Sequence, residues 1–185
     1  QLLTSVLEPT NEAYALAKIM GLRLCNYYKR QYGSNFISCM PTNLYGPNDN
    51  FNETYGHVYA TFISKFINTI GDITCWGDGS AKREFLYVDD LAEACIFLMN
   101  NYDGDEHVNI GTGEDVSIRE LAELIAEMTE FKGNIIWDTS KPNGTPRKLL
   151  DVTKINNLGW KAKTSLREGT QKTIEWYKNS DNLRV

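Results

Sequence analysis

Short apolar runs alternate with segments of helical periodicity along this chain, and that alternation restricts the possible folds more than any other feature. Residues 83–100 read as a strand followed directly by a helix, and residues 107–110 and 134–138 are further short apolar runs. Residues 35–40 form a nearly continuous apolar run, as expected of a strand buried on both faces of a parallel sheet. Strands that alternate with helices predict the α/β class.

Several segments have the apolar spacing of helices. Apolar residues recur on one helical face between residues 12 and 27, and we expect this face to be buried. Gly33 follows the segment and is expected to end its helix. Further helices are expected within residues 56–70 and 165–179.

Capping and turn residues predict where other elements begin and end. Asp89 or Asp90 is the expected N-cap of the helix that follows the strand near residue 85. Ser117 and Glu120 have the spacing of a capping box, which opens another helix. The polar, turn-rich segments 41–51 and 139–148 are expected to be loops.

The same turn signals divide the chain into two parts. Residues 1–50 and 84–113 are expected to build the main sheet with its helices. Residues 51–83 and 114–185 are expected to leave that sheet and form a smaller lobe.

Charge and hydropathy exclude several classes of partner and location. The 185 residues carry a net charge of −5, so no bulk attraction to nucleic acid or to an anionic membrane is expected. The apolar runs are too short to span a membrane, and the first ten residues lack the features of a secretory signal. The four cysteines have no metal-site spacing and lie in apolar contexts, which predicts buried thiols in a reducing, cytoplasmic compartment. They are Cys25, Cys39, Cys75 and Cys95.

Tyr14 and Lys18 are the first candidates for chemistry. Residues four apart in a helix lie on one face, so both side chains are expected to point the same way. An ammonium group beside a phenol stabilises the phenolate and allows the tyrosine to act as a proton donor or acceptor. The alternative interpretation is a core tyrosine and a surface lysine that share a face by chance.

Several strings, in order along the chain, resemble the extended short-chain dehydrogenase/reductase family. They are YALAK at residues 14–18, PTNLYGP at 41–47, REFLYVDD at 83–90 and NIGTG at 109–113. More narrowly, MPTNLYGPNDNF, GHV, WGDG and SKPNGTPRKLLDVTKINNLGW are similar to the members that epimerise and reduce GDP-4-keto-6-deoxy-mannose with NADPH. The resemblance runs from residue 8 to about residue 176.

The resemblance implies a Rossmann-type NAD(P)-binding parallel sheet and a smaller α/β lobe that binds the sugar nucleotide. Residues 1–50 and 84–113 would be the C-terminal part of the dinucleotide-binding domain, and residues 51–83 and 114–185 the substrate lobe. Family members begin with a strand, a glycine-rich loop and a helix, and no segment here matches that unit. The family's serine and cysteine acid/base groups would also precede residue 1. We therefore expect the C-terminal portion of such an enzyme, without NADPH-dependent reduction by the 185 residues alone.

The resemblance also implies roles for individual residues. Tyr14 would supply the proton for ketone reduction, and Lys18 would stabilise its phenolate and contact the cofactor ribose. His57 would move protons at the sugar carbons beside the ketone, since a histidine titrates near neutral pH. It would also lie near the cofactor. The cofactor's nicotinamide end would lie along the loop after the strand, and its residues are Pro41, Thr42, Asn43 and Leu44.

A GDP-sugar also requires cationic and aromatic contacts. Lys65, Arg83 and Lys148 match the family positions that contact the diphosphate and sugar, and Trp76 matches an aromatic contact. Arg147 shares a loop with Lys148, and the two roles stay open. No metal ligand is expected.

Two other interpretations stay open. One is another sugar-nucleotide epimerase or dehydratase of the same family, and the other is a module that binds a nucleotide-sugar without catalysis. The resemblance further implies a homodimer in the complete enzyme. We also expect association through the surface near the first helix and residues 35–40.

Overall fold

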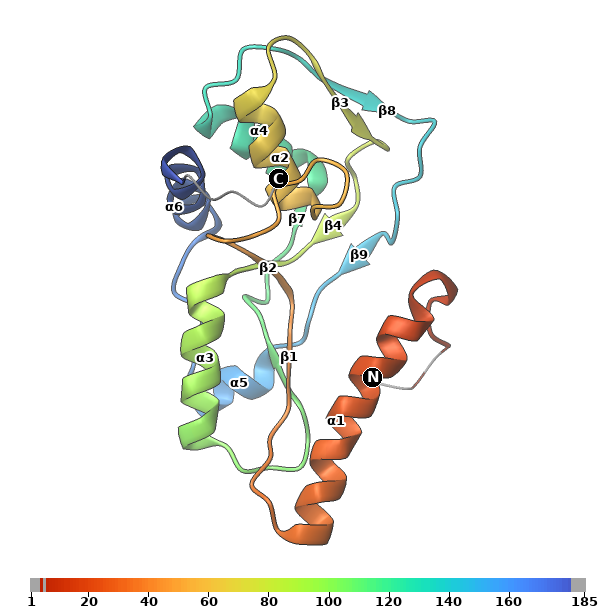
Figure 1. The fold of residues 1–185 in the computed structure, drawn as a ribbon, viewed down its shortest axis with the longest axis vertical. Helices are drawn as coiled ribbons and strands as arrows, with labels where there is room; N and C mark the ends of the chain where they lie inside the picture. Colours follow the sequence, from red (N-terminus) through yellow and green to blue (C-terminus); the bar gives the residue numbers. More distant parts are fainter. Residues whose placement is uncertain (1–3, 5, 181–185) are drawn as a thin grey trace.

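The computed structural model describes residue 4 and residues 6–180 as an α/β fold, which confirms the expected class (Figure 1). A short 3₁₀ helix, η1 (Pro9–Asn11), precedes the first α-helix. The α-helices are α1 (Glu12–Tyr32), α2 (Val58–Asn68), α3 (Val88–Asn101), α4 (Ile118–Met128), α5 (Thr153–Leu158) and α6 (Leu166–Asn179). The strands are β1 (Cys39–Pro41), β2 (Asn43–Tyr45), β3 (Ile73–Trp76), β4 (Lys82–Arg83), β5 (Phe85–Tyr87), β6 (Val108–Ile110), β7 (Val116–Ser117), β8 (Ile135–Asp138) and β9 (Arg147–Lys148).

Most strand pairs are parallel. β1 pairs with β6, β2 with β5 and β3 with β8, each in parallel. β4 lies between β7, which is antiparallel to it, and β9, which is parallel. Parallel pairs need long crossover connections, and helices supply several of them here, as the sequence alternation predicts.

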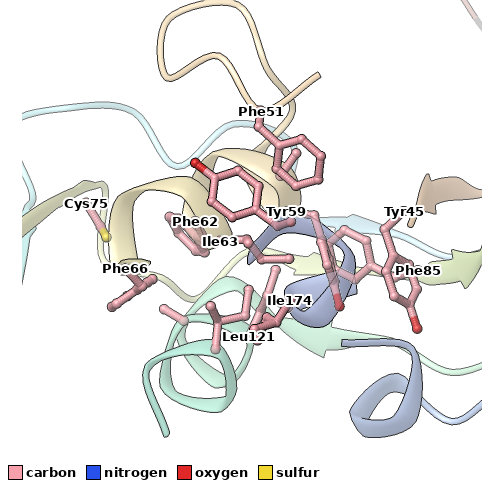
Figure 2. Close-up of a cluster of buried hydrophobic side chains, with 14 of the residues drawn as sticks. Tyr45, Phe51, Tyr59, Phe62, Ile63, Phe66, Cys75, Phe85, Leu121 and Ile174 are labelled. Carbon is pink, nitrogen blue, oxygen red and sulfur yellow. The ribbon is translucent and has the colours of Figure 1, made fainter. Parts of the chain in front are cut away.

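The buried side chains form two clusters. The first includes Tyr45, Tyr59 and Ile63 and is covered by α2, α4 and α6 (Figure 2). The rings of Tyr45 and Tyr59 stack with centroids 4.2 Å apart. The second cluster includes Leu98 and Ile155 and joins α3, α5 and β6. Because both clusters exclude water from large apolar side chains, each contributes hydrophobic stabilisation of its own.

The expected burial of the first helix is wrong. α1 has no buried residue, and Met20 is 65% exposed. Asn26 and Lys29, in the C-terminal half of the helix, connect it to the body: the Asn26 side chain donates to the Asp105 carbonyl, and Lys29 pairs with the Asp105 carboxylate. Figure 1 accordingly shows α1 standing beside the rest of the molecule. An amphipathic pattern reports an apolar face, but it does not report whether another element covers that face.

The expected burial of residues 35–40 and of the cysteines also needs correction. Only residues 39–41 form β1, and Cys39 is exposed because β1 pairs with β6 alone. Cys25 and Cys95 are half-buried, and Cys75 is buried. All four thiols are free, as expected.

The capping predictions have mixed outcomes. Ser117 and Glu120 form the expected capping box at the start of α4, and Gly33 ends α1 with a left-handed backbone (φ 67°). The N-cap of α3 is Tyr87, so the prediction of Asp89 or Asp90 is wrong. Both aspartates lie in the first turn, where a carboxylate stabilises the helix dipole.

Short elements were not expected from the sequence. β2 lies within the expected loop 41–51, and β9 lies within the expected loop 139–148. α5 is a further element without a sequence prediction. The expected division into two parts includes residues 1–3, 5 and 181–185, which lie outside the described residues, and the division stays a prediction. No helix among the described residues is long and apolar enough to cross a membrane.

The packing of α6 onto β2 generates a stability prediction. Gly169 is a buried residue of α6, and a Cβ atom there would overlap the phenol oxygen of Tyr45. We expect Gly169→Ala to lower the free energy of unfolding by about 1–3 kcal/mol, the usual cost of overpacking. Gly21→Ala is the matched control, because a Cβ at this α1 glycine would meet nothing within 4 Å. Urea denaturation measures both, and an equal effect of the two changes would contradict the prediction.

Candidate active site

Tyr14 and Lys18 share one face of α1, as their spacing predicts. The Lys18 ammonium lies 5.3 Å from the centroid of the Tyr14 ring. Tyr14 is 62% exposed, and within the described part of the chain no hydrogen bond to either side chain is present. The phenol and the ammonium are therefore adjacent and open to a ligand.

The start of this helix lies near a strand of the expected substrate lobe. Hydrogen bonds from Thr10 are the main cause of a lowered pKa at the Glu8 carboxyl, and the charge of Lys148 lowers it further. Figure 1 shows the start of α1 and β9 on the same side of the molecule. α1 thus begins beside one of the residues that the sequence assigns to substrate.

The segment 41–44, where β1 runs into β2, is held from the side of β5 and β6. The Thr42 amide donates to the Ile110 carbonyl at 3.0 Å. The side chains of Thr42 and Asn43 both donate to the Glu84 carbonyl, at 3.3 and 2.8 Å. Leu44 packs against the second cluster. Residues 41–44 therefore occupy a fixed path, which suits the predicted role of contacting a cofactor through backbone groups.

His57 occupies the N-cap position of α2. Its carbonyl accepts the Thr61 amide at 2.9 Å, but its side chain makes no capping hydrogen bond. The residue is exposed. The imidazole is therefore not used to cap the helix, which leaves the predicted proton-transfer role open.

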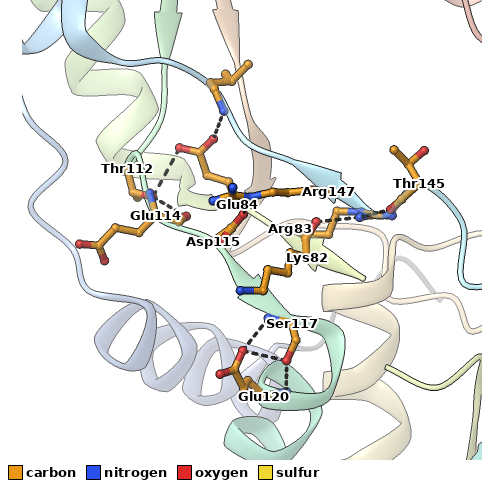
Figure 3. Close-up of polar contacts among 11 residues, drawn as sticks. Lys82, Arg83, Glu84, Thr112, Glu114, Asp115, Ser117, Glu120, Thr145 and Arg147 are labelled. Carbon is orange, nitrogen blue, oxygen red and sulfur yellow. Dashed lines mark hydrogen bonds and ion pairs between the residues drawn. The ribbon is translucent and has the colours of Figure 1, made fainter. Parts of the chain in front are cut away.

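Arg83 and Lys148 are direct neighbours. They are register partners in the parallel pair β4–β9. The Arg83 guanidinium donates to the carbonyls of Lys82 and Thr145, each at 2.7 Å (Figure 3). Burial lowers the pKa of Arg83 below its ordinary value. The two predicted substrate cations therefore come from adjacent strands and share one side of the small sheet.

The structure distinguishes Lys148 from Arg147. Arg147 forms an ion pair with Asp115, and this contact lowers the pKa of the Asp115 carboxyl and raises that of Arg147 (Figure 3). Lys148 is exposed and has no ion pair within the described ranges. Its charge is therefore the more available of the two.

Lys65 and Trp76 lie by β3. Lys65 is in the last turn of α2, and its charge partly offsets the burial that raises the pKa of Cys75. Trp76 ends β3, is 69% exposed, and has the Lys141 ammonium 5.8 Å from its ring centroid. Within the described part of the chain, no hydrogen bond or ion pair joins either residue to Arg83, so convergence of the whole set stays a prediction.

Sequence reasoning missed Glu84 and Asn143. The Glu84 side chain is fully buried and accepts hydrogen bonds from two backbone amides. The Asn143 side chain accepts the Asp78 amide at 2.8 Å and so links the loop 139–148 to the turn after Trp76. A carboxylate inside an apolar strand was the available signal for Glu84.

One cavity among the described residues, of about 440 Å³, includes Arg83. It also borders Thr112, Glu114 and residues 161–166, and none of the other predicted site residues. No group of metal-ligating side chains is present in residues 6–180. Of the predicted site residues, Arg83 alone therefore lines this cavity.

Comparisons with known proteins identify the family of this chain. The sequence pattern of the NAD dependent epimerase/dehydratase family matches residues 1–111, and the chain belongs to that family. Within it, the chain is 54% identical to GDP-L-fucose synthase 1 of Arabidopsis thaliana over 180 residues, which are 95% of this chain and 56% of the relative. It is 46% identical to GDP-L-fucose synthase of Escherichia coli (strain K12) over 198 residues, which cover 100% of this chain and 62% of the relative.

A solved structure gives the same result. The GDP-L-fucose synthetase of Naegleria fowleri bound to NADP superimposes with a TM-score of 0.87 at 31% identity, over 95% of this chain and 58% of that chain. These similarities confirm the resemblance drawn from the motifs and the Rossmann-type fold class. The chain spans about half the length of the curated relatives that it matches.

The contacts of Arg83 generate a prediction about local dynamics. One terminal guanidinium nitrogen of Arg83 reaches both carbonyls, and a lysine ammonium lies one bond closer to the backbone, so Arg83→Lys should loosen β9 from β4. We expect the amides of Lys82 and Glu84, which donate to the carbonyls of Pro146 and Lys148, to exchange hydrogen about tenfold faster. Hydrogen–deuterium exchange measures this. Arg167→Lys, which changes a surface pair with Glu127, is the control and should leave these amides unchanged.

Proposed function

We propose that this chain carries the substrate lobe and the Tyr–Lys helix of an enzyme that converts GDP-4-keto-6-deoxy-mannose to GDP-L-fucose with NADPH. The observation that carries the proposal is the register of Arg83 with Lys148, which places two cations side by side. A diphosphate carries the opposite charge to these two cations, and charge-assisted hydrogen bonds between such groups are strong. The GDP-L-fucose synthase relatives support the choice of nucleotide-sugar.

The residues present fit one part of the cofactor. Lys18 and Tyr14 offer a cation and a phenol beside each other, and residues 41–44 offer a fixed backbone path. The Gly113 amide, in the glycine turn after β6, is bonded to the Glu84 carboxylate at 2.8 Å and is not available to phosphate. The fit therefore concerns the ribose and nicotinamide end.

Reduction and epimerisation assign distinct proton transfers to these residues. NADPH, when bound, supplies hydride to the C4 carbon of the ketone. Tyr14 donates its phenolic proton to the ketone oxygen, and Lys18 stabilises the phenolate that remains. His57 exchanges protons at the carbons on either side of the ketone, because the carbonyl makes both of them acidic. The ketone thus gains one hydride and one proton.

The proposal extends to location and assembly. A cytoplasmic location is supported by the four free thiols. A homodimer of the complete enzyme is supported by the exposed apolar residues of α1, such as Met20 and Leu24. Each remains part of the proposal.

Nucleotide-sugar binding without catalysis is a second candidate for the 185 residues by themselves. The favouring observation is the exposure of Tyr14, which no contact joins to residues 41–44 within the described ranges. Binding and catalysis therefore need separate measurements.

The catalytic assignment predicts the effect of Tyr14→Phe. In a chain of the relatives' full length that contains these residues, the change should lower NADPH-dependent reduction by about a hundredfold or more, since a general acid is lost. GDP binding should stay within about twofold, because the phenol is not assigned to phosphate. Tyr27→Phe, at another exposed tyrosine of α1, is the control. Reduction at the wild-type rate by the Tyr14 variant would contradict the assignment.

The binding assignment predicts the behaviour of the 185 residues themselves. We expect calorimetry to detect GDP binding, while titration with NADPH produces neither tight binding nor reduction of a ketosugar. Lys148→Ala should weaken GDP binding by about 1.5–3 kcal/mol, the loss of one charge-assisted contact. Lys132→Ala, at an exposed lysine of the turn after α4, should leave it unchanged. Tight NADPH binding, or an equal effect of both lysine changes, would be inconsistent with this assignment.

A further inference from the structure

Glu84 is a carboxylate in a place where charge is costly. It lies between Arg83 and Phe85, in the short link between β4 and β5, and its relative exposure is 0%. A buried carboxylate is tolerated only where hydrogen-bond donors replace water. Its surroundings therefore show which segments it holds.

The carboxylate joins two segments that are far apart in the sequence. One oxygen accepts the Gly113 amide at 2.8 Å, and the other accepts the Leu150 amide at 3.0 Å (Figure 3). The Thr112 hydroxyl lies 3.5 Å from the first oxygen. A Cβ atom at Gly111 would overlap the carboxylate, so glycine is required for this approach. The turn after β6 and the segment after β9 thus share one acceptor group.

The backbone of the same residue contacts a third segment. Its carbonyl accepts the Asn43 and Thr42 side chains at 2.8 and 3.3 Å. Its amide donates to the Lys148 carbonyl at 3.3 Å. Glu84 therefore touches the loop assigned to cofactor and the strand assigned to substrate phosphate.

We propose that Glu84 is a positioning residue that holds Lys148 and the loop 42–43 in fixed relation. The inference rests on the proposed function, because it concerns how the same site is assembled. The carboxylate does not contact substrate in this assignment. It accepts the amide of Leu150, two residues beyond Lys148. It thereby fixes the position of Lys148, the cation assigned to phosphate, relative to Arg83 and Asn43.

Glu84→Gln tests the proposal with little change in volume. One carboxylate oxygen becomes an NH₂ group, which faces a backbone amide and leaves that donor without an acceptor. We expect GDP to bind about tenfold more weakly, since a displaced β9 moves Lys148. The measurement is made by calorimetry on the 185-residue chain, at a temperature where near-ultraviolet circular dichroism shows the native fold.

Asp90→Asn is the matched control. Asp90 is 6% exposed, and its carboxylate accepts the amides of Lys163 and Thr164 at 3.0 and 2.9 Å. Both amides bond to the same oxygen, Oδ2, and the Thr164 hydroxyl bonds to Oδ1. Asparagine can therefore keep an oxygen toward the amides and turn its NH₂ group toward the hydroxyl, so the change removes a buried acid but should leave GDP affinity within about twofold. Equal weakening by both variants would reduce Glu84 to a purely structural role and overturn the proposal. Unchanged affinity in Glu84→Gln would overturn it as well.

Two further measurements keep the outcomes distinct. If Glu84→Gln does not fold, Glu84→Asp is measured instead, since it keeps both acceptor oxygens on a shorter side chain. We expect this variant to bind GDP detectably but more weakly than the wild type. Failure of the wild-type chain to bind GDP would overturn the proposed function. Hydrogen exchange would then still decide the inference, since Glu84→Gln should accelerate exchange at Lys82, Gly113 and Leu150 together, and acceleration at Gly113 alone would overturn it.

Discussion

A carboxylate that is buried away from water needs hydrogen-bond donors from the protein. At Glu84 these donors are the backbone amides of Gly113 and Leu150, which are 29 and 66 residues away in the sequence. Neither amide belongs to a regular strand pair, so the carboxylate replaces the partner that a longer sheet would have provided. The turn after β6 and the segment after β9 keep their places because of it. The buried Glu84 carboxylate therefore positions two cations on the surface, Arg83 and Lys148.

Hydrophobic packing has a similar dependence on one short element. β5 has three residues, and its side chains alternate between the two clusters. Phe85 and Tyr87 belong to the first cluster, and Leu86 belongs to the second. Residue 84 precedes this strand directly. The polar link and the apolar link between the two halves of the structure thus lie within four consecutive residues.

Sequence alone predicted the class and the elements with strong local signals. The helices α2, α4 and α6 and the strands β6 and β8 have clear periodicity or caps, and the capping box at Ser117 is a local motif. β2, β4, β7 and β9 have two or three residues each, and their partners define them more than their composition does. The burial of α1 was mispredicted because an apolar face does not specify what covers it.

The candidate site shows the same limit. The resemblance identified Arg83 as a contact of the substrate, yet its neighbour Glu84 is the residue that is fully buried. Adjacent residues of an extended segment point in opposite directions, and composition does not decide which of them points inward. The spacing of Tyr14 and Lys18 was sufficient to place them together, because a helix fixes it locally.

The docking of α6 has a consequence for the order in which the chain can fold during synthesis. Tyr59 bonds to Thr170 and Ser64 to Tyr177, across separations of 111 and 113 residues. α2 leaves the ribosome long before these partners exist, so the part of its surface that α6 covers stays exposed until α6 is made, even after α4 has packed against it. Closing such long loops costs entropy that local contacts do not repay, and folding slows accordingly. Until α6 emerges, the surface of α2 that it covers is therefore open to contacts with other proteins.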